Sequence, residues 1–496
     1  MPVFMKHTEA RRRPPINSST GPTWTRRGFL QSTVGGILAL GIAACDDLGL
    51  EEENPLFDGP QINEADFIAF NAEYYNIGVD AKTQFPCSYV SGGQPAGETD
   101  PASIAFRLQY LIDQGNAASA TIETLIDHLL AAQIDQAPPR NYRNLLPRLA
   151  FNTSEAGTEP ASREYYVIHN ATLSARVAMA AQAFKGTSIE SKALTFLDKQ
   201  KAGYNDLLAR STGFLPTVID AGIRGVDGPE FSLLFGGYYE GAAFVLSYFI
   251  GDTDDIADPQ VGLDVWQAMI DNQNTLTSEH LASTVGSVAI QSPLARNGSG
   301  FQYFHALFGL DPGTLPLSMT NALYNVLYSY LDAAFFDHLP GIYSAGPNLG
   351  GNFLEDNGLN RLATRERLQR SQETVVTIDA LAAAMRLFPE PSEERQILRG
   401  WIGLYASVSG ILSTNGYYGS IDKDGQIAQS LFARQNGAMI LLQSTAASLL
   451  DAFLLDQGKP SLRDLFGQVV LTYQGTPIQR IENALPVPPD PAILFT

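Results

Sequence analysis

Cysteine and histidine are scarce in this sequence. Among its 496 residues there are 2 cysteines and 6 histidines, and the histidines are scattered along the chain. Two thiols allow no disulfide framework and no thiolate metal site, and scattered imidazoles argue against a metal cluster. The sequence also lacks a glycine-rich phosphate loop, a dinucleotide fingerprint and a G-x-S-x-G nucleophile elbow. We therefore expect no metal ion and no other cofactor.

Basic residues are also few. The chain has 32 lysines and arginines against 52 aspartates and glutamates, and its formal net charge is −20 at pH 7. This sign repels phosphate backbones, so we expect no nucleic-acid partner. The hydrophobic fraction of 45% is ordinary for a globular protein and can supply a large core.

Long hydrophobic runs are missing too. The apolar stretch at residues 34–44 is about a dozen residues long, whereas a membrane-spanning helix needs about 20. It follows Arg26 and Arg27, and this order resembles the signal of the twin-arginine export route. It ends in an Ile-Ala-Ala-Cys run at Cys45 that resembles a bacterial lipobox, in which the cysteine is acylated and becomes the first mature residue. The alternative is a plain signal peptide in which the cysteine occurs by chance.

The same features divide the chain into three expected segments. Residues 1–44 would be a twin-arginine lipoprotein signal peptide, residues 45–62 a flexible acidic tether, and residues 63–496 one large domain. Acylated Cys45 would hold the protein on a lipid bilayer, at the periplasmic face of the cytoplasmic membrane or at the cell surface. Cys87 would then have no partner, and we expect it to be a buried structural thiol.

Hydrophobic residues recur with the period of a helix in several segments. The segments are residues 170–184, 240–249, 322–336, 371–388 and 429–450, and another helical stretch is expected to begin at residues 277–280. Asn170 and Ser371 are candidate N-caps, and Gly186 lies just beyond the end of its helix. Alternating runs typical of strands are scarce, so the expected fold class is mainly α.

Short loops of one form recur between these helices. Each begins with Gly or Asn, continues with two large apolar or aromatic residues, and ends with a small residue or proline. They start at Asn144, Gly213, Gly341 and Gly416. This spacing suggests a unit of about 65–75 residues, longer than the roughly 34–47 residues of α-solenoid repeats. Two helices with long connections fit such a unit, which favours a closed double ring of six inner and six outer helices over an open solenoid.

The alternation of these loops with helices rich in small residues resembles the six-hairpin glycosidases, which have an (α/α)6 toroid of six helical hairpins. It is similar in particular to the branch of glucoamylase-like proteins and endo-β-1,2-glucanases. The residues that carry this similarity are 144–151, 170–184, 213–220, 236–241, 341–358, 371–388, 416–425 and 434–439. The resemblance implies that residues 63–496 form a catalytic toroid. The chain departs from the branch at residues 165–170, which lack the acidic residues that the family has before its second inner helix.

The resemblance also implies an inverting pair of carboxylates, with Glu240 as proton donor and Asp424 as base. Cleavage of a glycosidic bond needs both groups, and inverting enzymes hold them about 6.5–9.5 Å apart. The acid must keep its proton near neutral pH, and the aromatic residues just before Glu240 offer an apolar setting of the required kind. The alternatives are an exposed glutamate at a helix start and, for Asp424, a solvated Asp-Gly turn.

Aromatic rings and polar groups near the loop ends are candidate substrate contacts, because pyranose faces are weakly apolar and sugar hydroxyls need partners. The candidates are Tyr238, Tyr239, Tyr303, His305, Tyr343, Glu355, Asp356, Tyr417 and Asp422. The alternative is that the rings fill the core between helices and that the carboxylates belong to structural loops.

Three functions are compatible with the sequence. The leading hypothesis is an exported, membrane-tethered glycoside hydrolase that acts on a glucan or a related oligosaccharide. The second is a polysaccharide lyase on the same toroid, with a tyrosine or His169 as base, although a negatively charged chain is a poor match for an anionic polymer. The third is a glycan-binding lipoprotein without catalysis. The linkage and the oligomeric state do not follow from the sequence.

Overall fold

The computed structural model describes residues between 62 and 469. The described ranges are 62–134, 144–147, 151–152, 164–210, 216–220, 230–233, 277–283, 286–292, 294–295, 297–337, 341–347, 353–354, 357–363, 375–408, 410–422 and 427–469. All of them belong to one compact unit, Leu48–Thr496. The predicted signal peptide, residues 1–44, lies outside the described residues, as do residues 45–61 of the predicted tether.

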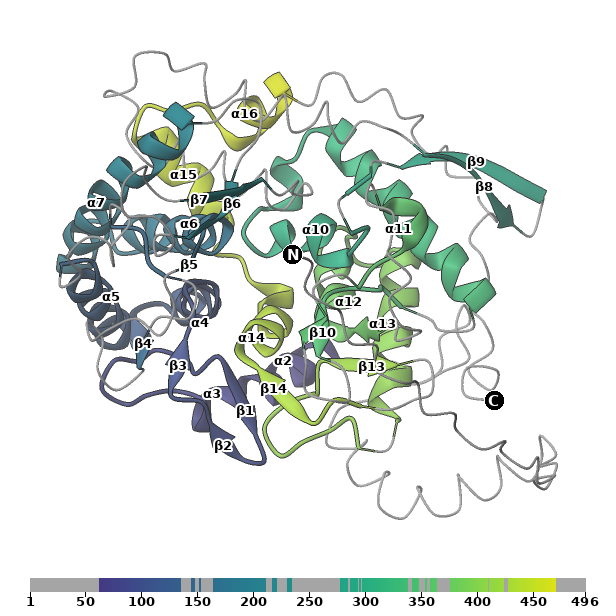
Figure 1. The fold of residues 1–496 in the computed structure, drawn as a ribbon, viewed down its shortest axis with the longest axis horizontal. Helices are drawn as coiled ribbons and strands as arrows, with labels where there is room; N and C mark the ends of the chain where they lie inside the picture. The colour runs from purple at the N-terminus through teal and green to yellow at the C-terminus, as the bar shows by residue number, and fades with distance from the viewer. Residues whose placement is uncertain are drawn as a thin grey trace, which may run out of the picture. The chain divides into compact units, whose positions relative to one another are not determined.

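Helices make up most of the described chain, as Figure 1 shows. The α-helices are α2 (Glu64–Ala72), α3 (Tyr74–Ile77), α4 (Pro101–Asp113), α5 (Ser119–Ile134), α6 (Val167–Ala183), α7 (Ser188–Arg210), α10 (Gly300–Phe304), α11 (Leu317–Asp337), α12 (Ile378–Met385), α13 (Glu393–Ala406), α14 (Ala433–Ile440), α15 (Ser448–Asp456) and α16 (Leu462–Val469). The 3-10 helices are η1 (Gly115–Ala118), η2 (His305–Phe308), η3 (Pro312–Thr314), η4 (Asn360–Leu362) and η5 (Leu441–Gln443). The mainly α class predicted from the sequence is confirmed.

The strands are short and pair in small antiparallel sheets. They are β1 (Tyr89–Ser91), β2 (Gln94–Pro95), β3 (Glu98–Thr99), β4 (Phe151–Asn152), β5 (Glu164–Tyr166), β6 (Pro216–Asp220), β7 (Glu230–Leu233), β8 (Thr277–Ser283), β9 (Gly286–Ser292), β10 (Gly346–Pro347), β11 (Phe353–Leu354), β12 (Val375–Thr377), β13 (Ser420–Asp422) and β14 (Ser430–Phe432).

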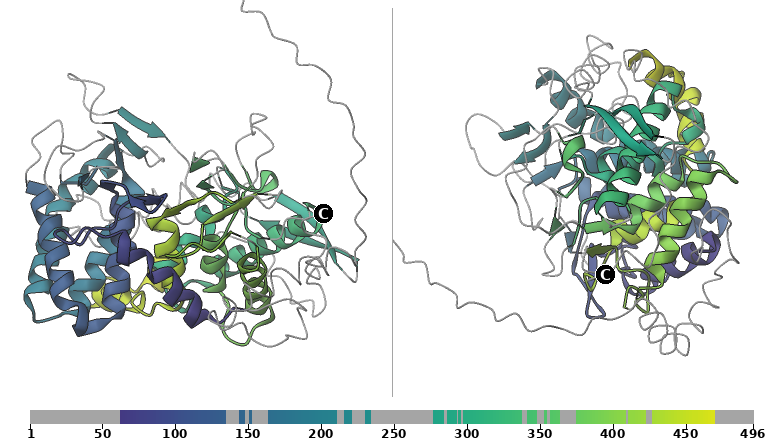
Figure 2. Two further views of the ribbon diagram at one scale, coloured as in Figure 1. Left: turned by 90° about the horizontal axis from the view of Figure 1, so that it is seen from below. Right: turned by 90° about the vertical axis from the view of Figure 1, so that its right-hand side faces the viewer.

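Consecutive helices pack against each other as hairpins. This holds for α4 with α5, α6 with α7, and α12 with α13. The first helix of each hairpin also contacts helices from elsewhere in the chain: α4 packs against α6 and α14, and α14 packs against α12. The helices α6, α4, α14 and α12 thus form an inner row, with α5, α7 and α13 on its outer side (Figure 1; Figure 2).

Small side chains allow α12 to lie within this row. Every residue of α12 is buried, and its sequence, IDALAAAM, is half alanine. An alanine-rich surface lets neighbouring helices approach closely, and α12 packs against α10, α13 and α14. The small residues that the sequence analysis found in the inner helices therefore allow close packing of α12 against its neighbours.

Each helix of the inner row begins at the end of a short strand. β5 runs into α6, β12 into α12 and β14 into α14, and only Asp100 separates β3 from α4. These strands pair with segments from other parts of the chain: β3 with β4, β5 with β6, β12 with β13, and β14 with β1. The strand pairs therefore fix where the inner helices start.

The recurring loops share a positive φ angle at their first residue. Asn144, Gly341 and Gly416, the first residues of three of them, have φ angles of 66°, 139° and 124°. Only glycine, and asparagine less readily, adopts this region without strain, which explains the residue types at this position. Gly213, which begins another such loop, lies outside the described residues.

Asn170 anchors one of these loops, and its predicted role as an N-cap is wrong. The helix α6 begins earlier, at Val167, because β5 leads directly into it. The Asn170 side chain accepts a hydrogen bond from the backbone N–H of Leu146 at 2.7 Å and donates one to the Leu146 carbonyl at 2.8 Å. Gly186 follows the end of α6 with a φ of 82°, as expected for a residue just beyond a helix.

The helix predicted at residues 371–388 is shorter in the structure. Residues 375–377 form β12, and α12 starts at Ile378. Two valines and a threonine favour an extended strand, and they pair with β13 in the register Val375 to Asp422 and Thr377 to Ser420. The proposed N-cap, Ser371, lies outside the described residues.

The predicted helix at residues 429–450 is broken into β14, α14, η5 and α15. At the break, the partly buried Arg386 donates hydrogen bonds to the carbonyls of Leu441 at 2.6 Å, Leu442 at 3.0 Å and Ser444 at 3.1 Å. These bonds satisfy carbonyls that a continuous helix would have used internally. Burial lowers the pKa of the Arg386 guanidinium to about 10, which still leaves it charged at neutral pH.

Of two further helix predictions, one is wrong and the other lies outside the described residues. The stretch expected to begin a helix at residues 277–280 is instead strand β8, which pairs with β9 from Thr277 opposite Ser292 to Ser283 opposite Gly286. The β-branched Val288 and Ile290 in β9 favour this pairing. The helix predicted at residues 240–249 lies outside the described residues.

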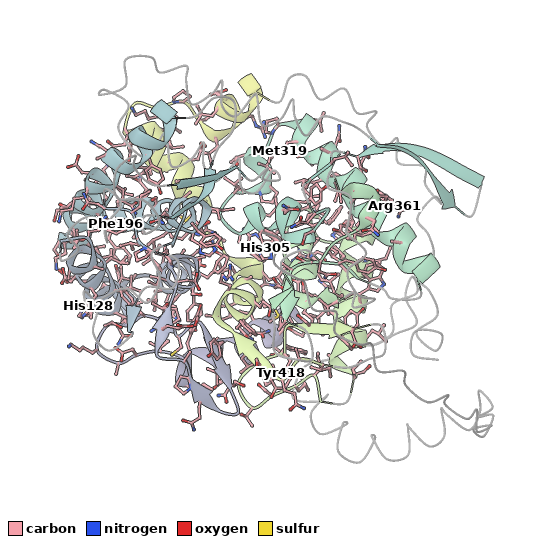
Figure 3. All side chains as sticks on the ribbon, in the orientation of Figure 1. His128, Phe196, His305, Met319, Arg361 and Tyr418 are labelled. Carbon is pink, nitrogen blue, oxygen red and sulfur yellow. The ribbon has the colours of Figure 1, made fainter. Side chains whose placement is uncertain are left out.

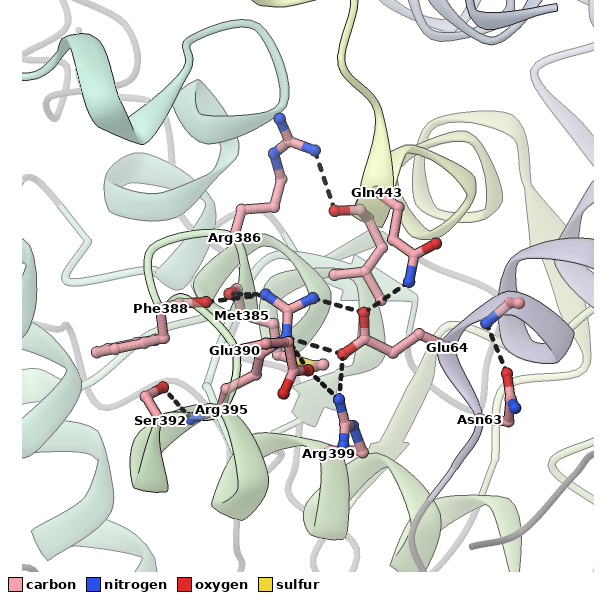
Figure 4. Close-up of polar contacts among 12 residues, drawn as sticks. Asn63, Glu64, Met385, Arg386, Phe388, Glu390, Ser392, Arg395, Arg399 and Gln443 are labelled. Carbon is pink, nitrogen blue, oxygen red and sulfur yellow. Dashed lines mark hydrogen bonds and ion pairs between the residues drawn. The ribbon is translucent and has the colours of Figure 1, made fainter.

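A buried ion-pair cluster joins the start of the described chain to its C-terminal half (Figure 4). Glu64, the first residue of α2, accepts hydrogen bonds from Arg395 Nε at 2.9 Å, Arg399 at 3.0 Å and Gln443 at 3.1 Å. Burial raises the pKa of the Glu64 carboxyl, but the bonds and charge of Arg395 outweigh it, so the pKa lies below its ordinary value. Arg395 also donates to the carbonyls of Met385 and Phe388, both at 2.9 Å.

Cys87 is a buried free thiol, as expected, and burial raises its pKa to about 11.

Within the described residues, no single helix is long and apolar enough to cross a membrane. The bent pair Ala433–Gln443 and Ser448–Asp456 meets that test of length and composition only when its two parts are taken together.

Candidate functional site

Polar side chains gather where the inner helices begin. They come from the N-cap of α4, from the first turns of α6, α12 and α14, and from η2, which follows α10. We call these residues the junction cluster: Asp100, His169, His305, Asp379, Arg434 and Gln435. Figure 3 shows His305 among the described helices, in the middle of the view.

Asp100 lies at the base of the first half of the cluster. Its Oδ1 accepts hydrogen bonds from the backbone N–H groups of Ala102 and Ser103, both at 3.0 Å, and Ser103 Oγ donates to Oδ2 at 2.5 Å. The carboxylate therefore caps α4, and its negative charge interacts favourably with the positive end of the α4 helix dipole. The Asp-Pro step at the start of α4 is the local sequence feature that sets this conformation.

Asp100, His169 and Arg434 form a chain of contacts from three inner helices. Arg434 Nη1 lies 3.1 Å from His169 Nε2, and His169 Nδ1 lies 3.8 Å from Asp100 Oδ1. Because a guanidinium can only donate, Nε2 must accept, and the ring proton then sits on Nδ1 and faces Asp100. The Tyr166 ring stacks on His169 with centroids 5.0 Å apart and the planes at 19°.

The charges of this half favour an ionised Asp100. Burial raises the pKa of the Asp100 carboxyl, but the guanidinium of Arg434, the imidazole of His169 and the hydrogen bonds from Ser103 outweigh it. The pKa consequently lies below its ordinary value. A buried carboxylate of this kind holds its neighbours in place and does not act as a proton donor at neutral pH.

His305, Asp379 and Gln435 form the second half. His305 Nε2 lies 2.9 Å from Asp379 Oδ2, and Gln435 Nε2 donates to Asp379 Oδ1 at 3.3 Å. The Asp379 side chain is only 2% exposed, so both of its oxygens are satisfied inside the protein. His305 packs edge-on against Phe301 and Phe308, with centroid distances of 6.2 and 5.6 Å.

The two halves meet at α14, where Arg434 and Gln435 are adjacent residues. The junction cluster therefore unites two His–Asp pairs with an arginine and an amide at the positive ends of several helices. Five of these six side chains are buried and paired within the protein, and Arg434, which is partly exposed, is the member most accessible to a polar, hydroxylated ligand. Within the described ranges, no group of three or more His, Cys, Asp or Glu side chains could hold a metal ion.

Most of the site residues predicted from the sequence lie outside the described residues. They are the proposed catalytic Glu240 and Asp424, the proposed contacts Tyr238, Tyr239, Glu355 and Asp356, and the signal residues Arg26, Arg27 and Cys45. Their roles stay predictions.

The predicted contacts Tyr303, Tyr343 and Tyr417 are buried in the hydrophobic core. Tyr303 donates from its hydroxyl to the Leu362 carbonyl at 3.2 Å, and Tyr343 packs against Tyr330 at a centroid distance of 6.0 Å. Their position agrees with the alternative interpretation, in which the rings fill the space between helices. Tyr303 and Tyr417 are 0% exposed and Tyr343 is 3% exposed, which leaves little ring surface for a sugar to stack on.

His305 and Asp422 are placed differently from these tyrosines. His305 is a member of the junction cluster. Asp422 is partly buried and ends β13, the strand that pairs with β12 in front of α12. His169, the base in the alternative lyase hypothesis, is also among the described residues and is a member of the junction cluster.

Sequence reasoning missed Asp100, Asp379, Arg434 and Gln435 as site residues. An aspartate before proline at a helix start was a readable N-cap signal for Asp100. The sequence gives no comparable sign for Asp379, because its partners His305 and Gln435 are 74 and 56 residues away.

No protein-family model matches this sequence, and no curated protein matches it. Solved structures do resemble it. The endo-β-1,2-glucanase of Talaromyces funiculosus in complex with sophorose has a TM-score of 0.67 and 13% identity, with 87% of this chain and 95% of that one covered. The endo-β-1,2-glucanase of Chitinophaga pinensis has a TM-score of 0.56 and 12% identity, covering 83% and 96%.

A provisionally assigned glucoamylase from Bacteroides uniformis is similar to a comparable degree, with a TM-score of 0.59, 12% identity, and 82% and 98% of the two chains covered. At these identities the likeness shows the fold. The predicted mainly α toroid is thereby confirmed, and this chain shares it with helical glycosidases of known structure.

Proposed function

We propose that this protein is a glycoside hydrolase that cleaves a β-1,2-linked glucan. The observation that carries the proposal is the likeness in fold to an endo-β-1,2-glucanase with sophorose bound, over 87% of this chain and 95% of that one. The junction cluster supports it, because donors and acceptors at the inner helix starts suit sugar hydroxyls. The surplus of acidic residues agrees with an uncharged substrate.

In the proposed mechanism Glu240 protonates the leaving oxygen and Asp424 activates a water molecule, with inversion at the anomeric carbon. Asp424 lies outside the described residues, and the support for this choice is the sequence resemblance. Residues of the junction cluster would orient the sugar between the two carboxyl groups.

The test is hydrolysis of purified glucans with β-1,2, β-1,3, β-1,4 and α-1,4 linkages. We expect activity on the β-1,2 polymer, and a loss of at least about 100-fold in kcat for Glu240→Gln and for Asp424→Asn. Glu123→Gln is the control, since the Glu123 side chain is 37% exposed and pairs with Ser188 and Lys192 on α7, away from the junction cluster residues. The product anomer, followed by polarimetry, reports inversion.

Three results would refute the proposal or part of it. Full activity in Glu240→Gln would remove the proposed acid. Unsaturated products that absorb ultraviolet light would identify a lyase, and absence of cleavage with every glucan would leave only a binding function.

We also propose that the protein is exported and held on the membrane through acylated Cys45. The support is the sequence alone: the arginine pair, the short apolar run and the small residues before the cysteine. In cells, Cys45→Ala should move the protein from the membrane to the soluble fraction, whereas Cys87→Ala should not. An unmodified Cys45 in the mature protein would refute lipid attachment.

A further inference from the structure

A three-stranded ribbon lies beside the start of α14. Its strand order is β14-β1-β2, and the register pairs Tyr89 with Phe432 and Ser91 with Ser430 (Figure 1). The backbone N–H of Ala433, the first residue of α14, donates to the Ser88 carbonyl at 3.0 Å. The ribbon is thereby tied to the helix that carries Arg434 and Gln435 of the junction cluster.

The two faces of the ribbon differ. On the inner face, Val90 and Leu431 are buried in an apolar cluster with Tyr74. The outer face carries Tyr89, which is 38% exposed, and Phe432, which is partly exposed, and their ring centroids are 5.9 Å apart. We call the outer residues the ribbon face: Tyr89, Ser91, Ser430 and Phe432.

Two hydroxyl groups lie beside the aromatic pair. Ser430 Oγ and Ser91 Oγ are 3.4 Å apart in an exposed position, and each serine is two residues along its strand from the ring on the same strand. Tyr89 is also the one aromatic residue among the exposed large hydrophobic side chains of the described residues. Rings next to hydroxyls are the combination that binds a pyranose, whose faces are weakly apolar and whose edges are polar.

The ribbon carries no charge, although the protein is strongly acidic. Neither residues 88–97 nor residues 427–433 include Asp, Glu, Lys or Arg, while the whole chain has a net charge of −20. An anionic or cationic partner would find no complementary group on this face. A neutral polyol needs none.

We propose that the ribbon face is a glucan-binding subsite next to the junction cluster, in which sugar rings stack on Tyr89 and Phe432 and hydrogen-bond to the serine hydroxyls. The identity of the ligand rests on the proposed function. The position of the face supports its role, because Phe432 is the N-cap of α14 and Arg434 follows two residues later. A glucan longer than the cleavage site would extend over it.

The experiment measures KM and kcat for soluble β-1,2-glucan, together with retardation of the protein in gels that contain the same polymer. We expect Tyr89→Ala to raise KM about tenfold, with a smaller change in kcat, and to reduce retardation. Tyr89→Phe keeps the ring and should retain most of the affinity. Leu317→Ala is the matched control, since Leu317 is 75% exposed and lies at the start of α11.

The outcomes separate the two proposals. If wild-type protein cleaves the glucan and Tyr89→Ala has an unchanged KM and retardation, the ribbon face is not a subsite and the proposed function stands. If the polymer retards wild-type protein through Tyr89 but is not cleaved, the subsite stands and the hydrolase proposal fails. If the glucan neither binds nor is cleaved, both are overturned.

Discussion

At the scale of single residues, Asp100 shows how one buried carboxylate can serve both a helix and a site. It caps α4 through the N–H groups of Ala102 and Ser103, and it faces His169 at 3.8 Å. An asparagine caps a helix about as well as an aspartate but carries no charge. The substitution Asp100→Asn therefore separates the two roles.

We predict that Asp100→Asn lowers kcat/KM on the glucan about 10- to 100-fold, because it removes the buried negative charge that faces His169 at 3.8 Å. The melting temperature should change little because the cap is kept. Ser103→Ala is the control: it removes one hydrogen bond to Asp100 but leaves the charge, and its effect should be smaller. Wild-type kinetics in Asp100→Asn would show that the charge does not position His169 and Arg434.

A second prediction at the residue scale concerns the contribution of Glu64 to stability. Its pKa is lowered in the folded protein, so its contribution to stability is fully present above the unfolded pKa, near 4.5, and is lost as the pH falls through the folded value. Glu64→Gln leaves Arg395 and Arg399 without their buried partner. We expect the free energy of unfolding in urea to fall by about 3 kcal/mol at pH 7.

The difference between wild type and Glu64→Gln should shrink as the pH drops below 4.5, because Glu64 becomes protonated first in the unfolded chain and then, below its lowered pKa, in the folded protein. Glu123→Gln provides the comparison. Its ion pair with Lys192 lies at the surface, where water and salt screen it, so we expect a much smaller loss than for Glu64→Gln. An equal loss in the two variants would mean that the buried cluster of Figure 4 adds no stability of its own.

Residue roles were predictable from the sequence where they depend on near neighbours. The buried thiol of Cys87 and the turn residue Gly186 are examples. The burial of Tyr303 and Tyr417 was not predictable, because a tyrosine in a loop between helices can face a ligand or the core with the same local sequence. The contacts of Asp379 come from η2 and α14 and exist only after folding.

At the scale of elements, the recurring loops explain why glycine is needed where the chain enters an inner helix pair. Gly341 has a φ of 139°, and a Cβ at this position would lie 2.2 Å from Val376 Cγ1 in β12. Both the backbone angle and the close approach exclude a larger residue.

We predict that Gly341→Ala lowers the free energy of unfolding by about 3 kcal/mol, from backbone strain and overpacking together. Gly92→Ala is the control, because Gly92 has a φ of 57° but nothing within 4 Å of the added Cβ, so only a backbone cost of about 1 kcal/mol remains. Adding Val376→Ala to Gly341→Ala should couple favourably in a double-mutant cycle. Additive effects would contradict the steric part of the argument.

The elements themselves were predictable where one period extends through them. The helices expected at residues 170–184 and 322–336 correspond to α6 and α11. Junctions were not predictable, because the three residues before α12 and α14 take the strand conformation only through pairing with β13 and β1. The break after α14 likewise depends on Arg386, which is distant in sequence.

At the scale of the whole molecule, the toroid was predictable although the identity to solved toroids is only 12–14%. The repeat length, the glycine or asparagine at each loop start and the small residues of inner helices are requirements of the architecture, and many different sequences can meet them. The chemistry depends on a few carboxylates whose mutual distance no periodicity encodes. Glu240 and Asp424 consequently rest on resemblance and await the hydrolysis experiment.

The net charge of −20 gives the last prediction, which concerns the molecule as a whole. A neutral glucan has no charge for the field of the protein to act on, so its KM should change less than about twofold between 50 and 500 mM salt. A carboxymethylated glucan of the same length is repelled at low salt, and its KM should fall as screening increases. Initial rates with both polymers measure this. If the neutral glucan is cleaved poorly and the anionic one is preferred at low salt, the prediction is contradicted. The site would then have to carry enough local positive charge, around Arg434, to outweigh the surrounding carboxylates.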